Sequence, residues 1–278
     1  MNSLYYEEIV KQALREDLGF QDLTTEAIIP ENHVSTAEIT AKEEGILAGM
    51  DIAKRAFTLL DDQMSFEVKA KEGEHIYPGQ VVAVLEGKTR ALLGAERVAL
   101  NLLQRISGIA TGTHKAVECI KGFSCRLIDT RKTTPGLRGL EKYAVRTGGG
   151  YNHRFGLFDA ILIKDNHIAA AGGITQAVSL VREKVGHMVK VEVETETLAQ
   201  VEEALQTPVD IIMLDNMPAE KMKEAVQLIN RKVLVEASGG ITLDSLVKVA
   251  ETGVDLISLG WLTHSIKALD LSLNIVAK

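Results

Sequence analysis

The sequence is poor in cysteine. Only Cys119 and Cys125 occur among its 278 residues, and two cysteines at this spacing provide neither a disulfide framework nor a set of metal ligands. This excludes small disulfide-stapled proteins and zinc modules. A chain of this length is instead sufficient for one large domain or two modest ones.

Long apolar runs are missing as well. Runs such as AILI (160–163) and IIML (211–214) are far shorter than the roughly 20 residues with which a helix crosses a bilayer. The N-terminal stretch MNSLYYEEIVKQALRED is acidic and amphipathic, whereas a signal peptide has a basic and then an apolar region. We therefore expect a cytoplasmic protein with no membrane partner.

The chain also lacks an excess of basic residues. The chain has 31 Lys and Arg against 38 Asp and Glu, whereas a nucleic-acid-binding domain is usually basic overall. One segment departs from this balance, because residues 129–167 carry a net charge of +3 in a chain whose net charge is −7. Local positive charge among glycines and short apolar runs is typical of a concave site for a small, highly anionic ligand.

The first part of the chain mixes helical and strand patterns. Residues 4–16 have apolar side chains at helical spacing, and residues 16–30 are polar and rich in turn formers. A turn and a helix are expected over 45–61, and a long helix over 89–121. The segments with the composition of strands are 35–43, 64–76 and 80–87.

From Cys125 onward, six short segments rich in β-branched residues alternate with amphipathic helical patterns. The predicted strands are CRLIDT, AILIKD, VKVEVET, DIIMLDN, VLVEASG and DLISLGWL. Repeated strand–helix units predict a parallel sheet with right-handed crossovers. Because a full barrel of this kind has eight units, six units predict an incomplete barrel.

Polar residues mark the end of each predicted strand. In chain order they are Asp129, Arg131 and Lys132; Lys164, Asp165 and Asn166; Glu192 and Glu194; Asp215 and Asn216; Glu236 and Ser238–Gly240; and Gly260 with His264 beyond it. The carboxyl ends of parallel strands meet at one edge of a sheet, where the loops build active sites. We therefore expect one shared site at this edge.

The cations of this edge suit an anionic ligand. Arg131, Lys132, Arg154 and Lys164, with His153, are able to hold carboxylates and phosphates. Arg binds such groups through its planar fork, and Lys binds them as a point charge.

The remaining groups suit a sugar phosphate. Glu194 and Asp215 are acids that fit Mg²⁺ or ribose hydroxyls. Ser238–Gly240 and Gly260 suit backbone N–H groups that point at a phosphate. The glycine run at 147–150 allows a close backbone approach or the motion of a lid.

Structural roles are also open for several of these residues. Glu192 and Glu194 alternate with valines, so a role as interior ion-pair partners of Lys190 is an alternative. His167 and His187 have the context of structural or surface residues. Arg97, on the polar face of the predicted long helix, has the pattern of a solvated side chain, and Ser238–Gly240 alone also fits a simple turn.

The segment DTRKTTPGLRGLEKYAVRTGGGYNHR (129–154), followed by LIKDNH (162–167), resembles the quinolinate phosphoribosyltransferase family. Further similar motifs occur in the family's order, from about residue 90 to residue 275. They are ERVALNLLQRISGIAT, VEVET, IIMLDN, EASGGI and SLGWLTHS, with EDLGFQDLTT near the N-terminus.

The resemblance implies an N-terminal α/β sandwich domain over residues 1–110, joined by residues 266–278, and a six-stranded, incomplete parallel α/β barrel over 111–265. It implies an obligate homodimer in which each N-terminal domain covers the partner's barrel. The implied reaction joins quinolinate to 5-phosphoribosyl 1-diphosphate with Mg²⁺. Its products are nicotinate mononucleotide, diphosphate and CO₂, in the de novo biosynthesis of NAD.

The resemblance also implies which residues hold quinolinate. Its carboxylates are expected to contact Arg131, His153, Arg154 and Lys164, and Arg97 is expected to reach in from the other subunit. This role replaces the solvated one that the helical pattern alone gave Arg97.

The phosphoribosyl end follows in the same way. Lys132 and Lys164 are expected at the diphosphate, and Glu194 and Asp215 at the ribose and Mg²⁺, so these four residues are the expected catalytic residues. The residues expected to line the 5-phosphate end are Ser238, Gly239, Gly240, Gly260 and His264.

Two other functions stay open. One is a related phosphoribosyltransferase for another pyridine or a molybdenum-pathway ligand, although the number of cations favours a dicarboxylate. The other is a non-catalytic sensor of a phosphorylated metabolite. A sensor would keep its affinity after loss of Glu194 and Asp215, whereas an enzyme would lose its activity.

Overall fold

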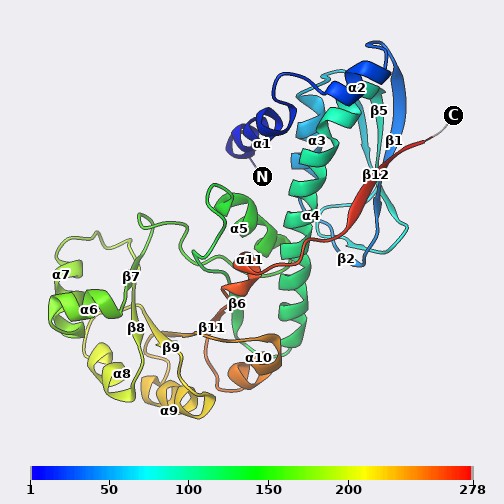
Figure 1. Ribbon diagram of the computed structural model, residues 1–278. Coiled ribbons are helices and arrows are strands. Elements are labelled where there is room, and N and C mark those ends of the chain that lie inside the picture. Colours follow the sequence, from blue (N-terminus) through cyan, green and yellow to red (C-terminus); the bar gives the residue numbers. More distant parts are fainter. Residues whose placement is uncertain (1, 277–278) are drawn as a thin grey trace. The chain divides into compact units, whose positions relative to one another are not determined.

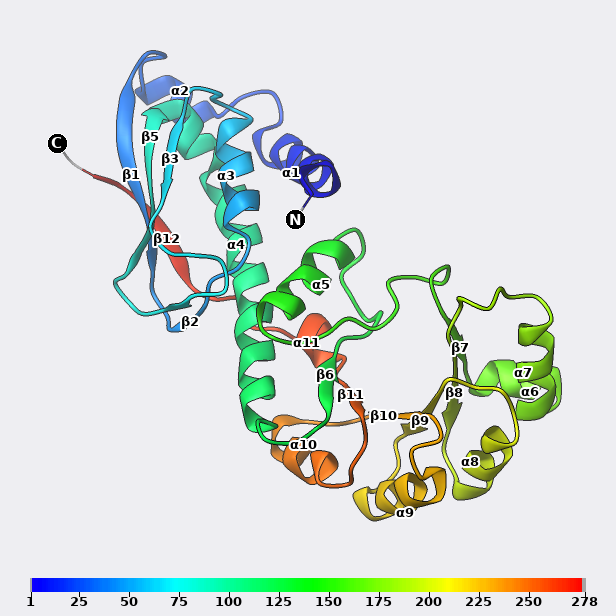
Figure 2. The same ribbon diagram turned by 180° about the vertical axis from the view of Figure 1, so that it is seen from behind.

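The structure is a computed structural model that describes residues 2–276, and the chain forms two compact units (Figures 1 and 2). The first unit comprises the chain up to His114, Thr133–Gly149 and the residues from Leu262 onward, and the second comprises Lys115–Lys132 and Gly150–Trp261. The sequence predicts a division near residue 110. The units instead change within helix α4 (Thr89–Cys119), and segment 133–149 goes with the first unit.

The first unit is built on a four-stranded antiparallel sheet in the order β12-β1-β5-β3. Its strands are β1 (Val34–Ala41), β3 (Ser65–Val68), β5 (Val81–Lys88) and β12 (Leu271–Val276). Alternate residues of β1 are buried, as in a strand with one face on a core. Strand β12 pairs with β1, so segments from the two ends of the chain lie side by side (Figure 1).

Helices α3 (Met50–Thr58) and α4 lie along one side of this sheet (Figure 2). Alanine, leucine and isoleucine side chains of α4, such as Leu92, Leu103 and Ile106, are fully buried. The other elements of this unit are α1 (Ser3–Leu18), α2 (Leu23–Ile28), α5 (Arg138–Thr147), most of α11 (Trp261–His264), and the paired strands β2 (Gly45–Ile46) and β4 (His75–Ile76).

Two of these helices depart from the sequence prediction. Residues 16–30 were expected to be turns, but α2 forms there because the Asp22 side chain accepts a hydrogen bond from the Thr25 backbone N–H (2.9 Å) and caps the helix. Helix α5 was not predicted either. It forms within the basic segment because Leu140, Ala144 and Val145 share one buried face.

The second unit is built on a six-stranded parallel sheet in the order β6-β11-β10-β9-β8-β7. The strands are β6 (Arg126–Ile128), β7 (Ile161–Ile163), β8 (Val191–Thr195), β9 (Ile211–Asp215), β10 (Leu234–Ser238) and β11 (Leu256–Ser258). Within residues 2–276, β6 and β7 do not pair with each other, so the sheet does not close into a barrel.

Helices follow the strands along the sheet in both views (Figures 1 and 2). They are α6 (Asp165–Ala171), α7 (Ile174–Arg182), α8 (Leu198–Leu205), α9 (Ala219–Ile229) and α10 (Leu243–Ala250). Each of the six predicted strands is present, and the predicted class, an N-terminal α/β domain with an incomplete parallel α/β domain, is confirmed. Among the described residues, no helix is both long enough and apolar enough to cross a membrane.

Candidate active site

A cavity of about 320 Å³ lies at the carboxyl ends of the parallel strands, and all of its lining residues belong to the second unit. Asp215, Ser238 and Ser258 are the last residues of β9, β10 and β11, and each lines the cavity. The structure brings together ten of the residues that the sequence singled out: Arg131, Lys132, His153, Arg154, Lys164, Glu194, Asp215, Ser238, Gly239 and Gly240.

Three other expected site residues do not line this cavity. Arg97 is an exposed residue of α4 in the first unit. His264, at the end of α11, is also in the first unit and lies 2.6 Å from the Ser265 hydroxyl through its Nδ1. Gly260 follows β11 in the second unit.

A buried aspartate joins the two segments that bear the cations. Asp129 follows β6 and is fully buried. Its carboxylate accepts hydrogen bonds from the backbone N–H of His153 (2.8 Å) and the side chain of Asn152 (2.7 Å). Because Arg131 comes two residues after Asp129, this contact fixes the strand end and the returning loop against each other.

Two arginines share the resulting end of the cavity. Arg154 donates a hydrogen bond through Nη1 to the carbonyl oxygen of Ala160 (2.9 Å). Partial burial lowers the pKa of Arg154, and the positive charge of Arg131 lowers it further. Two neighbouring cations that repel each other favour an anion that binds both. This end of the cavity is therefore suited to a carboxylate.

Lys164 and Glu194 form an ion pair within the cavity, with 2.8 Å between Nζ and Oε2. Lys164 comes directly after β7, and its backbone N–H donates to Nδ1 of His167 (2.9 Å) at the start of α6. His167 therefore has a structural role, and His187 is exposed, as the sequence context of both indicated.

The carboxylates of Glu194 and Asp215 provide the oxygen ligands of the cavity. Asp215 accepts a hydrogen bond from the side chain of Asn216 (2.6 Å). Mg²⁺ is commonly held by one or two carboxylates, while water and substrate phosphates complete its shell. The two residues therefore fit the cation that the sequence analysis expected.

A glycine turn forms the opposite wall. Gly239 and Gly240 have φ angles of +92° and +60°, a region that side chains with a Cβ rarely adopt. A Cβ on Gly239 would lie 2.3 Å from Oδ1 of Asn216, and the Asn216 backbone N–H donates to the carbonyl oxygen of Ser238 (2.9 Å). The turn thus requires glycine and joins the ends of β9 and β10.

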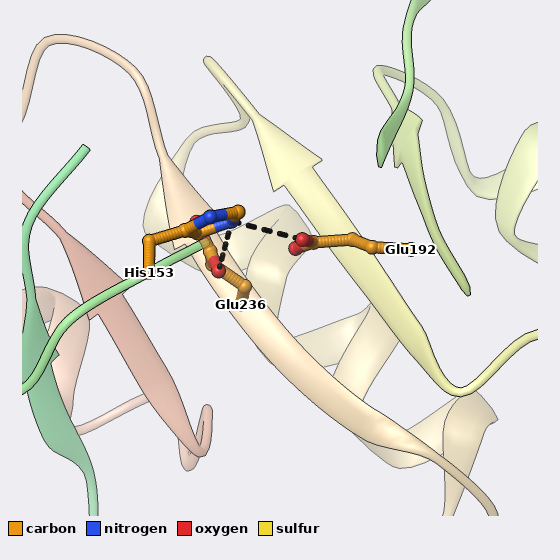
Figure 3. A group of neighbouring side chains, drawn as sticks. All are labelled: His153, Glu192 and Glu236. Carbon is orange, nitrogen blue, oxygen red and sulfur yellow. Dashed lines mark hydrogen bonds and ion pairs between the residues drawn. The ribbon is translucent and has the colours of Figure 1, made fainter. Parts of the chain in front are cut away.

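Beneath the cations lies a buried cluster of His153, Glu192 and Glu236, in which the histidine ring faces both carboxyl groups (Figure 3). His153 Nε2 is 2.9 Å from Glu192 Oε2 and 3.7 Å from Glu236 Oε2. The Arg154 backbone N–H donates to His153 Nδ1 (2.7 Å), so Nδ1 has no proton. The proton of the ring is therefore on Nε2 and is donated to Glu192.

Both acids of this cluster resist ionisation. Burial raises the pKa of Glu192 to about 7. Burial raises the pKa of Glu236 well above its usual range, and the nearby charge of Glu192 raises it further. A carboxyl group without water is more stable in its neutral form.

This cluster was not predicted from the sequence. The alternative in which Lys190 is an interior partner of Glu192 and Glu194 is wrong, because Lys190 pairs with Asp210 (2.7 Å). The available signal was a glutamate at an inward position of a strand otherwise made of apolar residues, in VEVET and again in VLVEAS.

Comparisons with known proteins agree with this arrangement. The family model "Quinolinate phosphoribosyl transferase, C-terminal domain" matches residues 109–274, and the N-terminal domain model of the same family matches residues 22–107. The chain is 50% identical over 275 residues to a probable nicotinate-nucleotide pyrophosphorylase [carboxylating] of Bacillus subtilis, covering 99% of this chain and 95% of that protein.

Two further relatives extend the comparison. A chloroplastic nicotinate-nucleotide pyrophosphorylase [carboxylating] of Arabidopsis thaliana is 44% identical, covering 96% of this chain and 82% of that protein. The crystal structure of NadC from Streptococcus pyogenes superposes with a TM-score of 0.95 at 43% identity, covering 100% of this chain and 99% of that one. The chain belongs to the quinolinate phosphoribosyltransferase family.

Proposed function

We propose that this protein transfers the phosphoribosyl group of 5-phosphoribosyl 1-diphosphate to quinolinate and removes one carboxylate, giving nicotinate mononucleotide, diphosphate and CO₂. This is a step in the de novo biosynthesis of NAD. The observation that carries the proposal is the single cavity in which several cations, two carboxylates and a glycine turn meet at the strand ends in a chain of this family.

The paired arginines account for the pyridine dicarboxylate. Arg131 and Arg154 are close enough for the charge of one to lower the pKa of the other, so a carboxylate between them relieves their repulsion. Both ring nitrogens of His153 already have partners in Arg154 and Glu192. We therefore assign His153 the role of holding the Arg154 segment at the wall of the cavity.

The other residues of the cavity suit the ribose and its leaving group. Lys132 and Lys164 provide positive charge for the diphosphate, and the Ser238–Gly240 turn provides a close backbone approach for the 5-phosphate. Glu194 and Asp215 fit Mg²⁺, which would neutralise the charge of the departing diphosphate.

The chemistry follows from these charges. The pyridine nitrogen attacks the anomeric carbon of the ribose as diphosphate leaves, and positive charge develops on the ribose in the transition state. Lys132 and Lys164 stabilise the departing anion, while the carboxylates of Glu194 and Asp215 stabilise the ribose cation. The N-ribosylated ring is then an electron sink, so the carboxylate beside the ring nitrogen departs as CO₂.

We further propose that the protein acts as a homodimer in which Arg97 enters the partner's cavity. Arg97 is exposed on α4 and lies outside the cavity of its own second unit. Large apolar side chains of the N-terminal helices and of the turn between them are also exposed, which is typical of a surface covered by a partner. They are Leu4, Phe20, Leu23 and Ile28.

The test is turnover of defined substrates. Purified protein is incubated with quinolinate, 5-phosphoribosyl 1-diphosphate and Mg²⁺, and CO₂ and nicotinate mononucleotide are measured, with nicotinate as the substrate of a parallel reaction. Product from quinolinate alone is the expected result. Turnover of nicotinate alone would contradict the proposal and indicate a salvage enzyme, and binding without turnover would indicate a sensor.

A further inference from the structure

The proposed reaction leaves one proton without a donor. When the carboxylate beside the ring nitrogen departs as CO₂, the electron pair of the broken bond stays on C2 of the pyridine. C2 must then receive a proton before nicotinate mononucleotide is complete. The following inference rests on the proposed function and asks which group of this chain gives that proton.

Several other ionisable groups of the cavity are poorly suited to this task. The Nε2–H of His153 is donated to Glu192, and its Nδ1 accepts the backbone N–H of Arg154. Lys164 is held by Glu194 at 2.8 Å. Arginine keeps its proton at any physiological pH, so Arg131 and Arg154 are not acids.

Glu236 differs from all of these groups. It lines the cavity although it is only 1% exposed. Within the described chain, neither of its carboxylate oxygens has a hydrogen-bond partner of good geometry, and the groups that face it are His153, at 3.7 Å, the carboxyl group of Glu192 and the hydroxyl of Ser258. An ionised carboxylate in such a place is costly, so Glu236 holds its proton.

A second cavity offers a route by which Glu236 regains a proton. It has a volume of about 260 Å³, and Arg126, Ile211 and Leu256, the first residues of β6, β9 and β11, are part of its lining. It therefore lies toward the opposite ends of the strands. Its wall includes the exposed Tyr151 and Lys190, and the volume is sufficient for several water molecules.

The two cavities meet at the buried cluster. Glu236, His153 and Arg154 line both of them, whereas Glu192 lines only the second. Figure 3 shows one ring nitrogen of His153 facing the carboxyl groups of both glutamates. A proton that leaves Glu236 toward the substrate can thus be replaced from the water side without opening the active-site cavity.

We propose that Glu236 is the catalytic acid of the decarboxylation step. As the bond between C2 and the carboxylate breaks and CO₂ leaves, the electron pair of that bond remains on C2 and takes up the proton of Glu236. The O–H bond of Glu236 breaks in the same step, so CO₂ release is coupled to the proton transfer. Glu236, now a carboxylate, takes a proton from water in the second cavity, so no further reactant is consumed.

The same three side chains have the composition of a metal site, but their geometry opposes it. A metal ion would need a lone pair on Nε2 of His153, which requires the ring proton on Nδ1. Nδ1 accepts the backbone N–H of Arg154 at 2.7 Å. A proton on Nδ1 would therefore point at the amide proton of Arg154. The cluster therefore holds a proton rather than a cation.

The experiment separates the two halves of the reaction. Glu236→Gln keeps the size and neutrality of the acid but has no proton to give. In a single turnover with quinolinate, we expect diphosphate to form at nearly the normal rate and CO₂ release to fall by about 10²-fold or more. The N-ribosylated dicarboxylate should then accumulate and be detected by mass spectrometry.

The matched control is Glu224→Gln, the same change at an exposed position of α9 where Glu224 pairs with Lys221 outside both cavities. We expect its diphosphate and CO₂ rates to keep the ratio of the unaltered protein. If Glu236→Gln lost both rates together, or kept both, Glu236 would not be the acid. If the unaltered protein did not turn over quinolinate, the proposed function itself would fail, which is a different result.

A second measurement needs no variant and decides the question if Glu236→Gln does not fold. The single turnover of the unaltered protein is repeated in D₂O. We expect CO₂ release to slow more than diphosphate formation, because only the former is coupled to a proton from the enzyme. Equal effects on both steps would overturn the proposal.

Discussion

Lys164 and Glu194 face each other at the ends of neighbouring parallel strands, with 2.8 Å between Nζ and Oε2. The register of β7 and β8, which places Ile163 opposite Val193, puts the two side chains at the same level. The pair is neutral as a unit. A diphosphate group therefore competes with Glu194 for Lys164, and a cation competes with Lys164 for Glu194.

We predict that Lys164 and Glu194 act as a unit. Lys164→Ala should lower kcat/KM for quinolinate by about 10²-fold or more, because a group that stabilises the leaving diphosphate is lost. The double variant with Glu194→Gln should cost little more than the worse single variant. Lys221→Ala, which breaks an exposed ion pair with Glu224 on α9, should leave the rate unchanged. Additive losses would contradict this prediction.

Arg131→Ala should remove most of the activity while the fold remains intact. The variant removes one of the two cations that hold a quinolinate carboxylate, and its main effect should be on transition-state binding. Circular dichroism and thermal melting should match those of the unaltered protein. Arg146→Ala, at an exposed position of α5 outside the cavity, is the control. Near-normal turnover by Arg131→Ala would show that the arginine pair does not bind the substrate.

Mixing two inactive variants tests the proposed dimer. A dimer of one Arg97→Ala chain and one Arg131→Ala chain has one complete site, because Arg97 of one chain serves the cavity of the other. After exchange of subunits, we expect about a quarter of the normal activity from random pairing. A mixture of Arg131→Ala chains and Arg154→Ala chains should not recover activity, since both residues serve the cavity of their own chain. Activity that does not recover in the first mixture would indicate that Arg97 acts within its own chain or not at all.

Gly239→Ala should destabilise the turn at the phosphate end. The residue has a φ of +92°, and its new Cβ would collide with Asn216, so the affinity for 5-phosphoribosyl 1-diphosphate should fall. The strained backbone should cost about 1–3 kcal/mol of stability in urea unfolding. Gly122→Ala separates strain from collision, because Gly122 has a φ of +100° and open space around it. Equal losses of affinity in the two variants would contradict the prediction that the collision of the new Cβ with Asn216 weakens binding.

Glu141→Ala tests how the first unit supports the basic segment. Glu141 is buried and accepts hydrogen bonds from Arg105 (2.6 Å) and from the backbone N–H of Thr134 (3.1 Å), two residues after Lys132. Removal of the acceptor leaves both donors without it, so the free energy of unfolding should fall by about 1–3 kcal/mol. Chemical denaturation measures the change. Glu118→Ala, whose partner Lys121 is exposed, should leave the stability unchanged.

The fold was largely predictable from the sequence because its signals are local. A parallel strand covered on both faces appears as a short β-branched run, as in Ile211–Asp215, and the connecting helices appear as amphipathic patterns. The short helices α2 and α5 were not predictable in this way. Formation of α2 depends on a single capping contact of Asp22, and formation of α5 depends on burial of one face, where Gly139 lies against Tyr5.

The sequence by itself determined the alternation of strands and helices, and therefore that the cations and acids at the strand ends face one cavity. The physical reason is that parallel strands direct all their carboxyl ends to one edge. Only the tertiary structure decided which groups are paired, because an ion pair depends on distances between strands. In the folded protein Lys190 pairs with Asp210 and Lys164 pairs with Glu194. Glu192 and Glu236 lie against His153 in the interior. Burial of the Glu236 side chain, which no local sequence pattern specifies, favours the protonated form of its carboxyl group.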